Sequence, residues 1–376
     1  MDVGGVEKAL LGVLSIIPFD RIDVTVGLLH HKGDFLDFLP HDVKIIDVNC
    51  YDKYWSIIND SPWSYIKGYL FAGRIKDALA HLALYVQRRT NGNHYWFYKY
   101  FMRNEEMLND ETFDVAVSFA GPSQMMDYYI CRKIKAHKKC CWIHFDVSRF
   151  GIDRGMTNRL YKDYDRIFIV SETAKMVFDR MFPRLCDKTV VFHNVVSPQA
   201  IKALSETGDT FCDGFEGKRI LTVGRISKEK GYEEALETLR MLIERKLQVK
   251  WYFVGGGKDI QECNTIVQQK HLQNNVCFLG VRTNPYAYMR DCDIYVQPSR
   301  HEGYCITLAE AMCFENPIVA TDFTGAREQL RERKNGIVSG MTPDDLCDAI
   351  MKAMSFKRVE GKRFYDNDID KFLQLL

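Results

Sequence analysis

Short apolar segments alternate with helix-like segments through the second half of the chain, and this alternation constrains the fold most. The segments typical of strands cover residues 219–226, 249–255, 276–280, 293–299, 317–321 and 336–339. Apolar residues at helical spacing lie between most of them. The alternation predicts a parallel sheet with helices on both faces. Because ligands of such sheets bind beyond the carboxyl ends of the strands, we expect functional side chains on the loops that follow them.

The first half shows the same alternation less regularly. Its strand candidates cover residues 22–28, 43–48, 113–119, 139–145, 166–170 and 189–195, and a long helical insertion lies between residues 51 and 107. A length of 376 residues suits two domains. Residues 196–217 mix Ser, Thr, Gly and Asp with little periodicity, which predicts a linker. We place the domain boundary near 200–217.

Composition excludes several classes of protein. The formal net charge of +1 argues against a nucleic-acid binder. The longest apolar run, residues 10–19, is too short to span a bilayer, and no secretion signal opens the sequence. The twelve cysteines are scattered without a disulfide or zinc spacing, so we expect reduced core cysteines in a cytoplasmic protein.

The start of the sequence departs from the expected pattern. Residues 1–5 read Met-Asp-Val-Gly-Gly, and a helix begins at once. A parallel domain of this type has a strand of about 5–6 residues before such a glycine turn. We expect either that the native chain starts upstream or that this domain lacks its first strand.

Two cations follow the first strand of the second half. Arg225 ends that strand, and Lys230 lies five residues later, before Gly231. Cations at the opening of a helix can hold a diphosphate. A lysine-rich turn in solvent is the alternative, and it is the better interpretation of this turn taken alone.

Two carboxylates follow a later strand. Glu302 lies on the loop after residues 293–299, and Glu310 lies in the next helix. Gly303 allows backbone amides to approach a ligand. Each carboxylate can accept hydrogen bonds from two neighbouring hydroxyls, so the pair could hold a ribose and a sugar ring. Ordinary surface glutamates are the alternative, but the combination is more specific than either residue.

With these motifs in order, residues 219–355 resemble the nucleotide-sugar glycosyltransferases of the GT-B fold, specifically the large retaining family 4. The matching features are Gly224-Arg225 with Lys230-Gly231, Gly255-Gly256-Gly257, Phe278-Leu279-Gly280, Pro298-Ser299 through Glu310, and Pro317 to Thr321 with Gly325. Glu302 and Glu310 fit the family's Glu-x7-Glu motif. The first half resembles the family more weakly, through residues 4–11 and Trp142-Ile143-His144.

The resemblance implies the domain plan. Residues 1–200 would form an acceptor-side Rossmann-like domain, and residues 217–355 a nucleotide-sugar-binding one. The two would face a central cleft. Residues 356–376 would include a helix that crosses back to the first domain.

The resemblance also implies roles for individual residues. Glu310 would bind the ribose and Glu302 the donor sugar near the reacting carbon. Gly303, Tyr304 and Cys305 would offer backbone amides, and Arg282 would lie near the base. These residues would bind a UDP-sugar in preference to a GDP-sugar.

The leaving diphosphate needs positive charge beside it. We assign this to Arg225 and Lys230, helped by the helix that begins at Gly5, and expect no metal or cofactor. Asp-x-Asp pairs begin at Asp163, Asp291 and Asp366, but two aspartates are a weak metal signal.

His144 matches a histidine that lies near the anomeric centre in the family. A strand-end histidine with a structural hydrogen bond is an equally weighted interpretation. The donor phosphate is thought to take the acceptor proton in this family, so the sequence names no general base.

Basic and aromatic residues are interleaved over residues 65–103, and residues 132–139 are also basic. Such helices can lie on an anionic membrane, and they can equally be ordinary helices with aromatic cores. We expect a cytoplasmic protein with peripheral contact at the inner face of the membrane.

The function that follows is a metal-independent retaining transfer of a hexose or N-acetylhexosamine to a glycan or lipid-linked acceptor in cell-surface polysaccharide synthesis. The alternative is a non-catalytic nucleotide-sugar-binding accessory subunit. A dinucleotide-binding oxidoreductase ranks last, because Gly255-Gly256-Gly257 is not a Gly-x-Gly-x-x-Gly turn.

Overall fold

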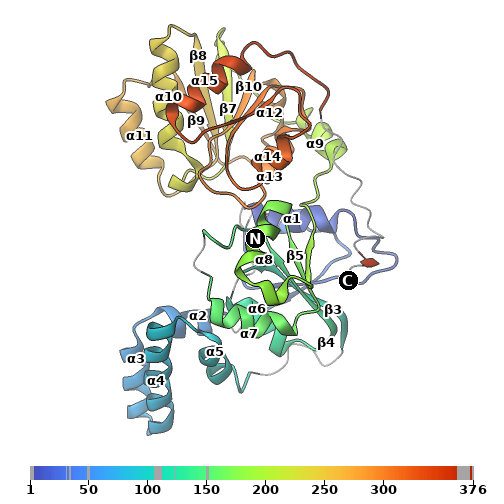
Figure 1. The fold of residues 1–376 in the computed structure, drawn as a ribbon, viewed down its shortest axis with the longest axis vertical. Coiled ribbons are helices and arrows are strands. Elements are labelled where there is room, and N and C mark those ends of the chain that lie inside the picture. Colours follow the sequence, from blue (N-terminus) through green and yellow to red (C-terminus); the bar gives the residue numbers. More distant parts are fainter. Residues whose placement is uncertain are drawn as a thin grey trace. The chain divides into compact units, whose positions relative to one another are not determined.

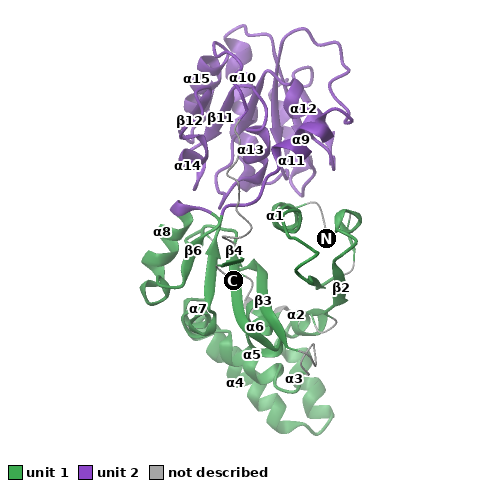
Figure 2. Cartoon of the chain, turned by 90° about the vertical axis from the view of Figure 1, so that its right-hand side faces the viewer, with its two compact units in different colours: residues 1–170, 174–192, 368–376 green, residues 171–173, 193–367 purple. Residues whose placement is uncertain are grey.

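The computed structural model describes residues 4–361 apart from 31, 34, 49–50, 106–111, 123 and 150–151, together with 373–374. The chain forms two compact units (Figure 2). Unit 1 comprises residues 1–170, 174–192 and 368–376, and unit 2 comprises residues 171–173 and 193–367. Parallel sheets covered by helices occur in both units, as the alternation predicted (Figure 1).

Unit 2 contains one continuous parallel sheet in the order β12-β11-β10-β7-β8-β9. Its strands are β7 (Lys218–Val223), β8 (Val249–Val254), β9 (Val276–Gly280), β10 (Ile294–Gln297), β11 (Ile318–Thr321) and β12 (Gly336–Ser339). Its helices are α9 (Pro198–Ser205), η4 (Lys228–Lys230), α10 (Tyr232–Glu244), α11 (Ile260–Gln269), α12 (Tyr286–Asp291), α13 (Ile306–Ala311), α14 (Ala326–Leu330) and α15 (Pro343–Ala353). Every strand and helix expected in this half is present. Buried apolar clusters cover both faces of the sheet.

Unit 1 contains two separate parallel sheets, in the orders β1-β2 and β3-β4-β5-β6. Its strands are β1 (Thr25–Leu28), β2 (Lys44–Asp47), β3 (Phe113–Gly121), β4 (Ala136–Ile143), β5 (Arg166–Ile169) and β6 (Thr189–Val191). Its helices are α1 (Gly5–Leu14), η1 (Leu36–Phe38), α2 (Tyr51–Asn59), α3 (Pro62–Phe71), α4 (Ile75–Asn91), α5 (Tyr95–Phe101), α6 (Gln124–Lys133), α7 (Arg154–Leu160), η2 (Tyr161–Asp163), α8 (Glu172–Met181) and η3 (Pro183–Leu185). The predicted helical insertion at 51–107 corresponds to α2 through α5.

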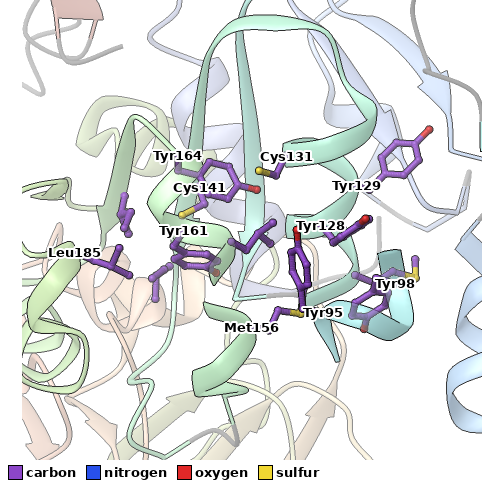
Figure 3. Close-up of a cluster of buried hydrophobic side chains, with 14 of the residues drawn as sticks. Tyr95, Tyr98, Tyr128, Tyr129, Cys131, Cys141, Met156, Tyr161, Tyr164 and Leu185 are labelled. Carbon is purple, nitrogen blue, oxygen red and sulfur yellow. The ribbon is translucent and has the colours of Figure 1, made fainter. Parts of the chain in front are cut away.

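A tyrosine-rich core fixes the larger sheet of unit 1 (Figure 3). The hydroxyls of Tyr161 and Ser118 donate to the buried carboxylate of Asp127, at 2.7 and 2.6 Å. Tyr164 donates to the Asp127 carbonyl at 2.7 Å. Because buried carboxylates require such partners, this network ties α6 to β3 and to the segment after α7.

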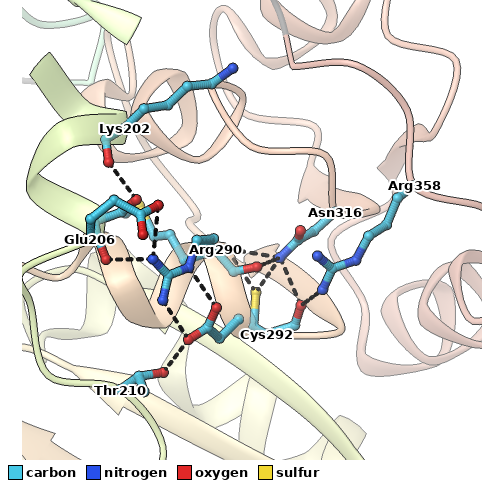
Figure 4. A network of polar contacts seen from close by, with 10 residues as sticks. Lys202, Glu206, Thr210, Arg290, Cys292, Asn316 and Arg358 are labelled. Carbon is cyan, nitrogen blue, oxygen red and sulfur yellow. Dashed lines mark hydrogen bonds and ion pairs between the residues drawn. The ribbon is translucent and has the colours of Figure 1, made fainter. Parts of the chain in front are cut away.

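Residues 196–217 are not simply a linker, because α9 lies within them. Ser197 caps this helix by accepting from the amide of Ala200, and Pro198 occupies its first turn. Helix α9 packs on α12, where Arg290 donates to the Ser205 carbonyl at 2.7 Å and pairs with Glu206 at 3.2 Å (Figure 4). The division between the two compact units lies at residue 193, which is upstream of the domain boundary expected near residues 200–217. The predicted crossing helix falls almost entirely outside the described residues.

Candidate active site

The loops after β7 and β10 meet at the carboxyl end of the unit 2 sheet. Gly231 has φ of +69°, and a Cβ there would lie 1.8 Å from the carbonyl oxygen of Pro298. The amide of Arg300 donates to the Glu229 carbonyl at 2.8 Å. Glycine is therefore required for the two loops to approach this closely. This approach brings Lys230 beside Glu302.

Lys230 and Glu302 form a largely buried ion pair. The Lys230 Nζ lies 2.5 Å from Glu302 Oε1, and the side chains are 21% and 12% exposed. Burial alone would lower the pKa of Lys230, but the Glu302 carboxylate outweighs it and the pKa is raised. Lys230 is therefore a fixed positive charge at neutral pH.

A chain of buried hydrogen bonds orients Glu302. Tyr295 donates to Gln297 Oε1 at 2.7 Å, and the Gln297 amide donates to Ser299 Oγ at 2.8 Å. Ser299 donates in turn to Glu302 Oε1 at 2.7 Å. Ser299 belongs to the Pro298-Ser299 motif of the sequence, but the motif alone pointed to no role for it. Because a preorganised carboxylate costs little to position, these residues hold Glu302 ready for a ligand.

The other predicted donor residues of unit 2 occupy neighbouring loops. Arg225, two residues after the end of β7, is exposed and makes no ion pair within the described residues. Gly303 and Cys305 are buried in the loop leading into α13, and burial raises the pKa of the Cys305 thiol to about 12. Arg282 is exposed on a different loop, after β9. Arg225 thus provides a cation open to solvent near Lys230.

Glu310 is buried in α13. Its Oε1 accepts from the hydroxyl of Tyr286 on α12 at 2.8 Å. Burial and the Glu310 carboxylate raise the pKa of Tyr286, which keeps its hydroxyl a donor. Nothing in the spacing of the sequence pointed to Tyr286, because its partner lies 24 residues away.

A second acidic position lies near Gly303 and was not predicted. Glu328 of α14 lies 2.7 Å from Nε2 of His193, whose ring is 5.6 Å from that of Tyr304. Ser171 donates to the Gly303 carbonyl at 3.4 Å. These contacts support the loop formed by residues 303–305. They come from segments distant in sequence, so no local pattern could have shown them.

Gly5 and His144 belong to unit 1. Gly5 is the exposed first residue of α1. His144 follows β4 and is buried, with Nε2 2.7 Å from the Phe119 carbonyl oxygen. Burial lowers the pKa of His144 to about 4, so the ring is neutral at physiological pH. The structural hydrogen bond considered for this residue is therefore present.

The aspartates of the two described Asp-x-Asp pairs have structural partners. Asp163 pairs with Arg132, and Asp165 accepts from the amide of Lys139 at 2.8 Å. Asp291 pairs with Arg290, and Asp293 with Lys218. Among the described residues, no three His, Cys, Asp or Glu side chains gather as metal ligands would. Asp366 lies outside them.

Comparison with known proteins finds a family model that is similar to residues 215–367. They match the sequence model of "Glycosyl transferases group 1". The chain is 25% identical over 158 residues to a poly(ribitol-phosphate) alpha-N-acetylglucosaminyltransferase of Staphylococcus aureus, covering 40% of this chain and 32% of that protein. It is 29% identical over 159 residues to an N-acetylgalactosamine-N,N'-diacetylbacillosaminyl-diphospho-undecaprenol 4-alpha-N-acetylgalactosaminyltransferase of Campylobacter jejuni, covering 42% of this chain and 40% of that protein. The chain therefore spans less than half of these relatives' lengths.

Solved structures extend the likeness to the fold of both units. HepE of Anabaena, solved with UDP and glucose, superposes with a TM-score of 0.61 at 18% identity, covering 94% of this chain and 87% of that one. The lipopolysaccharide outer core galactosyltransferase WaaB gives 0.61 at 16%, covering 99% and 95%. These values show the fold, and they confirm the predicted GT-B class. Helices long and apolar enough to cross a bilayer are not found in the described part of the chain.

Proposed function

We propose that this chain, whose residues 215–367 carry a group 1 glycosyltransferase domain on a GT-B fold, transfers a hexose-type sugar from a nucleoside-diphosphate sugar to a hydroxyl of a glycan or lipid-linked acceptor. The observation that carries the proposal is the buried Lys230–Glu302 pair beside the exposed Arg225. Polysaccharide-related transferases among the relatives support this class of reaction.

The cations account for departure of the diphosphate. As the bond from the anomeric carbon to the phosphate oxygen breaks, negative charge grows on that oxygen. Arg225 can bind the leaving phosphate with two parallel N–H donors, and Lys230 can bind it as a point charge. We propose that these two cations take the place of a metal ion. The acceptor oxygen bonds the same face of the anomeric carbon, and its proton passes to the leaving phosphate, so configuration is retained.

The carboxylates account for binding of the sugars. Glu310 would accept from the ribose hydroxyls and Glu302 from the donor sugar, with Gly303, Tyr304 and Cys305 offering amides and Arg282 lying near the base. A UDP-sugar remains our expectation over a GDP-sugar. In unit 1, His144 would contribute only a neutral hydrogen bond, because its lowered pKa leaves it uncharged, and Gly5 the positive end of α1.

Substitution of the ion pair tests this proposal. Lys230→Ala should lower donor-sugar turnover by about 10²–10³-fold, the usual effect of losing one charge-stabilising group. Glu302→Gln keeps the side-chain shape and should also lower it strongly. Lys228→Ala is the matched control, since Lys228 is an exposed lysine of the same η4 turn, paired with Glu262. Wild-type turnover in Lys230→Ala would refute the site.

One observation favours the alternative of a non-catalytic accessory subunit, which is that the sheet of unit 1 is divided in two. Such a subunit would bind UDP or a UDP-sugar through unit 2 and show neither donor hydrolysis nor transfer. Measuring both activities on a chain that binds UDP separates the two functions.

For the acceptor side, we propose that the helical hairpin α3–α4 contacts an anionic membrane. Phe71, at its tip, is 91% exposed, and Trp63, Leu70, Ile75 and Leu79 are each more than half exposed. Trp63 and Leu70 share one face of α3, and Ile75 and Leu79 share one face of α4. Lys67 lies on the same face of α3, and Lys76 is exposed beside the tip. An apolar face with flanking cations suits anionic lipid.

Vesicle co-sedimentation tests the hairpin. The wild-type chain should bind phosphatidylglycerol vesicles more than phosphatidylcholine vesicles, and Phe71→Ser with Ile75→Ser should reduce binding at least tenfold. Met176→Ser is the control, because Met176 is also 60% exposed but lies on α8. Equal binding by the double variant would exclude the hairpin as the contact.

A further inference from the structure

Two helices of unit 1, α5 and α7, present exposed cations to solvent. They pack on each other and on α6 (Figure 1). Their buried residues, among them Tyr95, Tyr98 and Met156, belong to the tyrosine-rich core (Figure 3). We give the name basic face to six exposed residues of this layer, which are Trp96 and Lys99 of α5, Arg154, Asn158 and Arg159 of α7, and Lys162 of η2.

The α7 part of the basic face is a row that follows the helical repeat. Arg154, Asn158 and Lys162 lie four residues apart, which places them along one side of the helix. The row extends on the order of 12 Å along the helix axis. Met156 and Leu160, which lie between these positions in the sequence, are buried. The basic face is therefore elongated, and its shape suits a chain better than a single ion.

The cations of the basic face form no ion pair within the described residues. They are Lys99, Arg154, Arg159 and Lys162. The exposed acid of the same helices, Asp163, is already paired with Arg132 of α6. Because clustered charges of one sign attract a ligand of the opposite sign, these cations favour an anionic partner.

Trp96 holds two of these cations in place. It is 40% exposed, and its ring centroid lies 4.6 Å from the Arg159 guanidinium and 5.0 Å from the Lys99 Nζ. The Arg159 guanidinium also lies 5.2 Å from the centroid of the Tyr95 ring. A contact with an aromatic face positions a cation while leaving its N–H groups unpaired, unlike a contact with a carboxylate. Lys99 and Arg159 therefore keep donors for an anion.

The chemistry of the basic face selects a chain of phosphates. The face contains no carboxylate that could accept from sugar hydroxyls, so it recognises its ligand by charge. Arginine binds a phosphate with parallel N–H donors and lysine binds it as a point charge. A row of cations on the order of 12 Å long can contact several phosphates of one chain.

Two other phosphate-bearing partners suit the basic face less well. Among the described residues of α5, α6 and α7, Trp96 is the exposed large apolar side chain, whereas a membrane contact buries an apolar face. Nucleic-acid chains are held by aromatic rings on which bases stack, and here the exposed ring already contacts two cations. A phosphate chain without bases or lipid tails fits these observations best.

We propose that the basic face binds a linear polymer of sugars or sugar alcohols joined by phosphodiesters, and that this polymer carries the acceptor hydroxyl. The acceptor role rests on the proposed function, whose acceptor it narrows to an anionic polymer. Binding of the polymer does not rest on it, because the cations of the basic face belong to unit 1 and the donor cations Arg225 and Lys230 to unit 2.

Titration of the full chain with a synthetic glycerol-phosphate hexamer tests the proposal. The comparison ligands are maltohexaose, which is neutral, a thymidylate hexamer, which adds bases, and phosphatidylglycerol vesicles. The chain should bind the glycerol-phosphate hexamer more weakly as salt is raised, and should bind maltohexaose about tenfold more weakly than the hexamer at low salt. Tighter binding of the thymidylate hexamer would overturn the proposal in favour of a nucleic acid. Vesicle binding that depends on the basic face, without hexamer binding, would overturn it in favour of a membrane.

Substitutions locate the binding on the basic face. The double variant Lys99→Ser with Arg159→Ser should weaken hexamer binding about tenfold and reduce its salt dependence. Lys138→Ser with Arg180→Ser is the matched control, since it removes the same charge from exposed residues of β4 and α8. Trp96→Leu removes no charge and should weaken binding about threefold, whereas Trp96→Phe keeps a ring and should lose less. Equal hexamer affinity in the wild-type chain and the Lys99/Arg159 double variant would overturn the proposal.

Titration of UDP into the same variants separates this inference from the proposed function. All of them should bind UDP as the wild-type chain does. A chain that binds UDP but not the glycerol-phosphate hexamer would overturn this inference alone. A chain that binds the hexamer but not UDP would contradict the proposed function, and with it the acceptor role, while the polymer site would stand.

Discussion

Unit 2 places its first strand, β7, between β8 and β10, whereas among the described residues of unit 1 β1 pairs only with β2 and β3 only with β4. In unit 2 all the residues of β10 and β11 are buried. In unit 1 the residues of β1 and β3 are mostly half-buried. The difference teaches that a central strand does two things, since it pairs the edges beside it and joins the cores on either side. The site residues that lie closest together belong to the unit whose sheet is complete.

The comparison predicts that a Leu→Ala substitution lowers the unfolding free energy more in the core of unit 2 than in unit 1. Equal losses in the two units would contradict it. Leu239 is fully buried in α10, and Leu239→Ala should cost about 2–5 kcal/mol of unfolding free energy. Leu10 lines a mainly apolar cavity of about 540 Å³ in unit 1 and is half-buried, so Leu10→Ala should cost only about 1 kcal/mol, because the space beside it is already open. Denaturant unfolding monitored in each unit measures both. A similar loss in the two variants would mean that the surroundings of Leu10 are as well packed as the core of unit 2.

The two units also differ in whether a buried titratable group keeps its charge. In unit 2, Lys230 is held charged by Glu302, whereas in unit 1 burial lowers the pKa of His144 to about 4. Between pH 6.5 and 4 the unfolded histidine takes up a proton that the folded one does not. His144 therefore does not reduce the unfolding free energy above pH 6.5. As the pH falls from 6.5 to 4, its lowered pKa reduces the unfolding free energy by up to about 3 kcal/mol.

The variant His144→Phe should flatten this loss between pH 6.5 and 4, as measured by denaturant unfolding at several pH values. The exposed His137→Phe serves as the control in the same unit. An unchanged pH dependence in His144→Phe would show that His144 is charged in the folded protein.

The smallest expected change in unfolding free energy concerns α9, which lies near the start of unit 2. Arg290 holds the end of α9 through Ser205 and Glu206 (Figure 4). Arg290→Met should cost about 1 kcal/mol, the usual net worth of such a hydrogen bond with a partly exposed pair, and should speed exchange in α9. No change in α9 exchange would mean that apolar packing alone fixes this helix.

The sequence predicted most of what local pattern determines. Every strand of the three described sheets was expected, because parallel strands are short apolar runs between helices. Helix α9 was missed because its eight residues sit among Ser, Thr and Gly, and only packing on α12 shows its role.

Long-range contacts account for what could not be predicted at the site. Lys230 and Glu302 were each expected to bind the donor, but their pairing depends on Gly231 meeting Pro298 across two loops. Tyr286, His193 and Glu328 lie far along the chain from the residues they support. Such partners follow from the packed sheet and not from spacing.

Calorimetric titration of UDP tests the central claim most directly, which is that Arg225 and Lys230 hold a diphosphate at the carboxyl edge of the unit 2 sheet. The wild-type chain and the Lys228→Ala variant should bind UDP with equal affinity. The double variant that combines Arg225→Ala and Lys230→Ala should bind UDP at least a hundredfold more weakly. Equal affinity in all three would contradict the account.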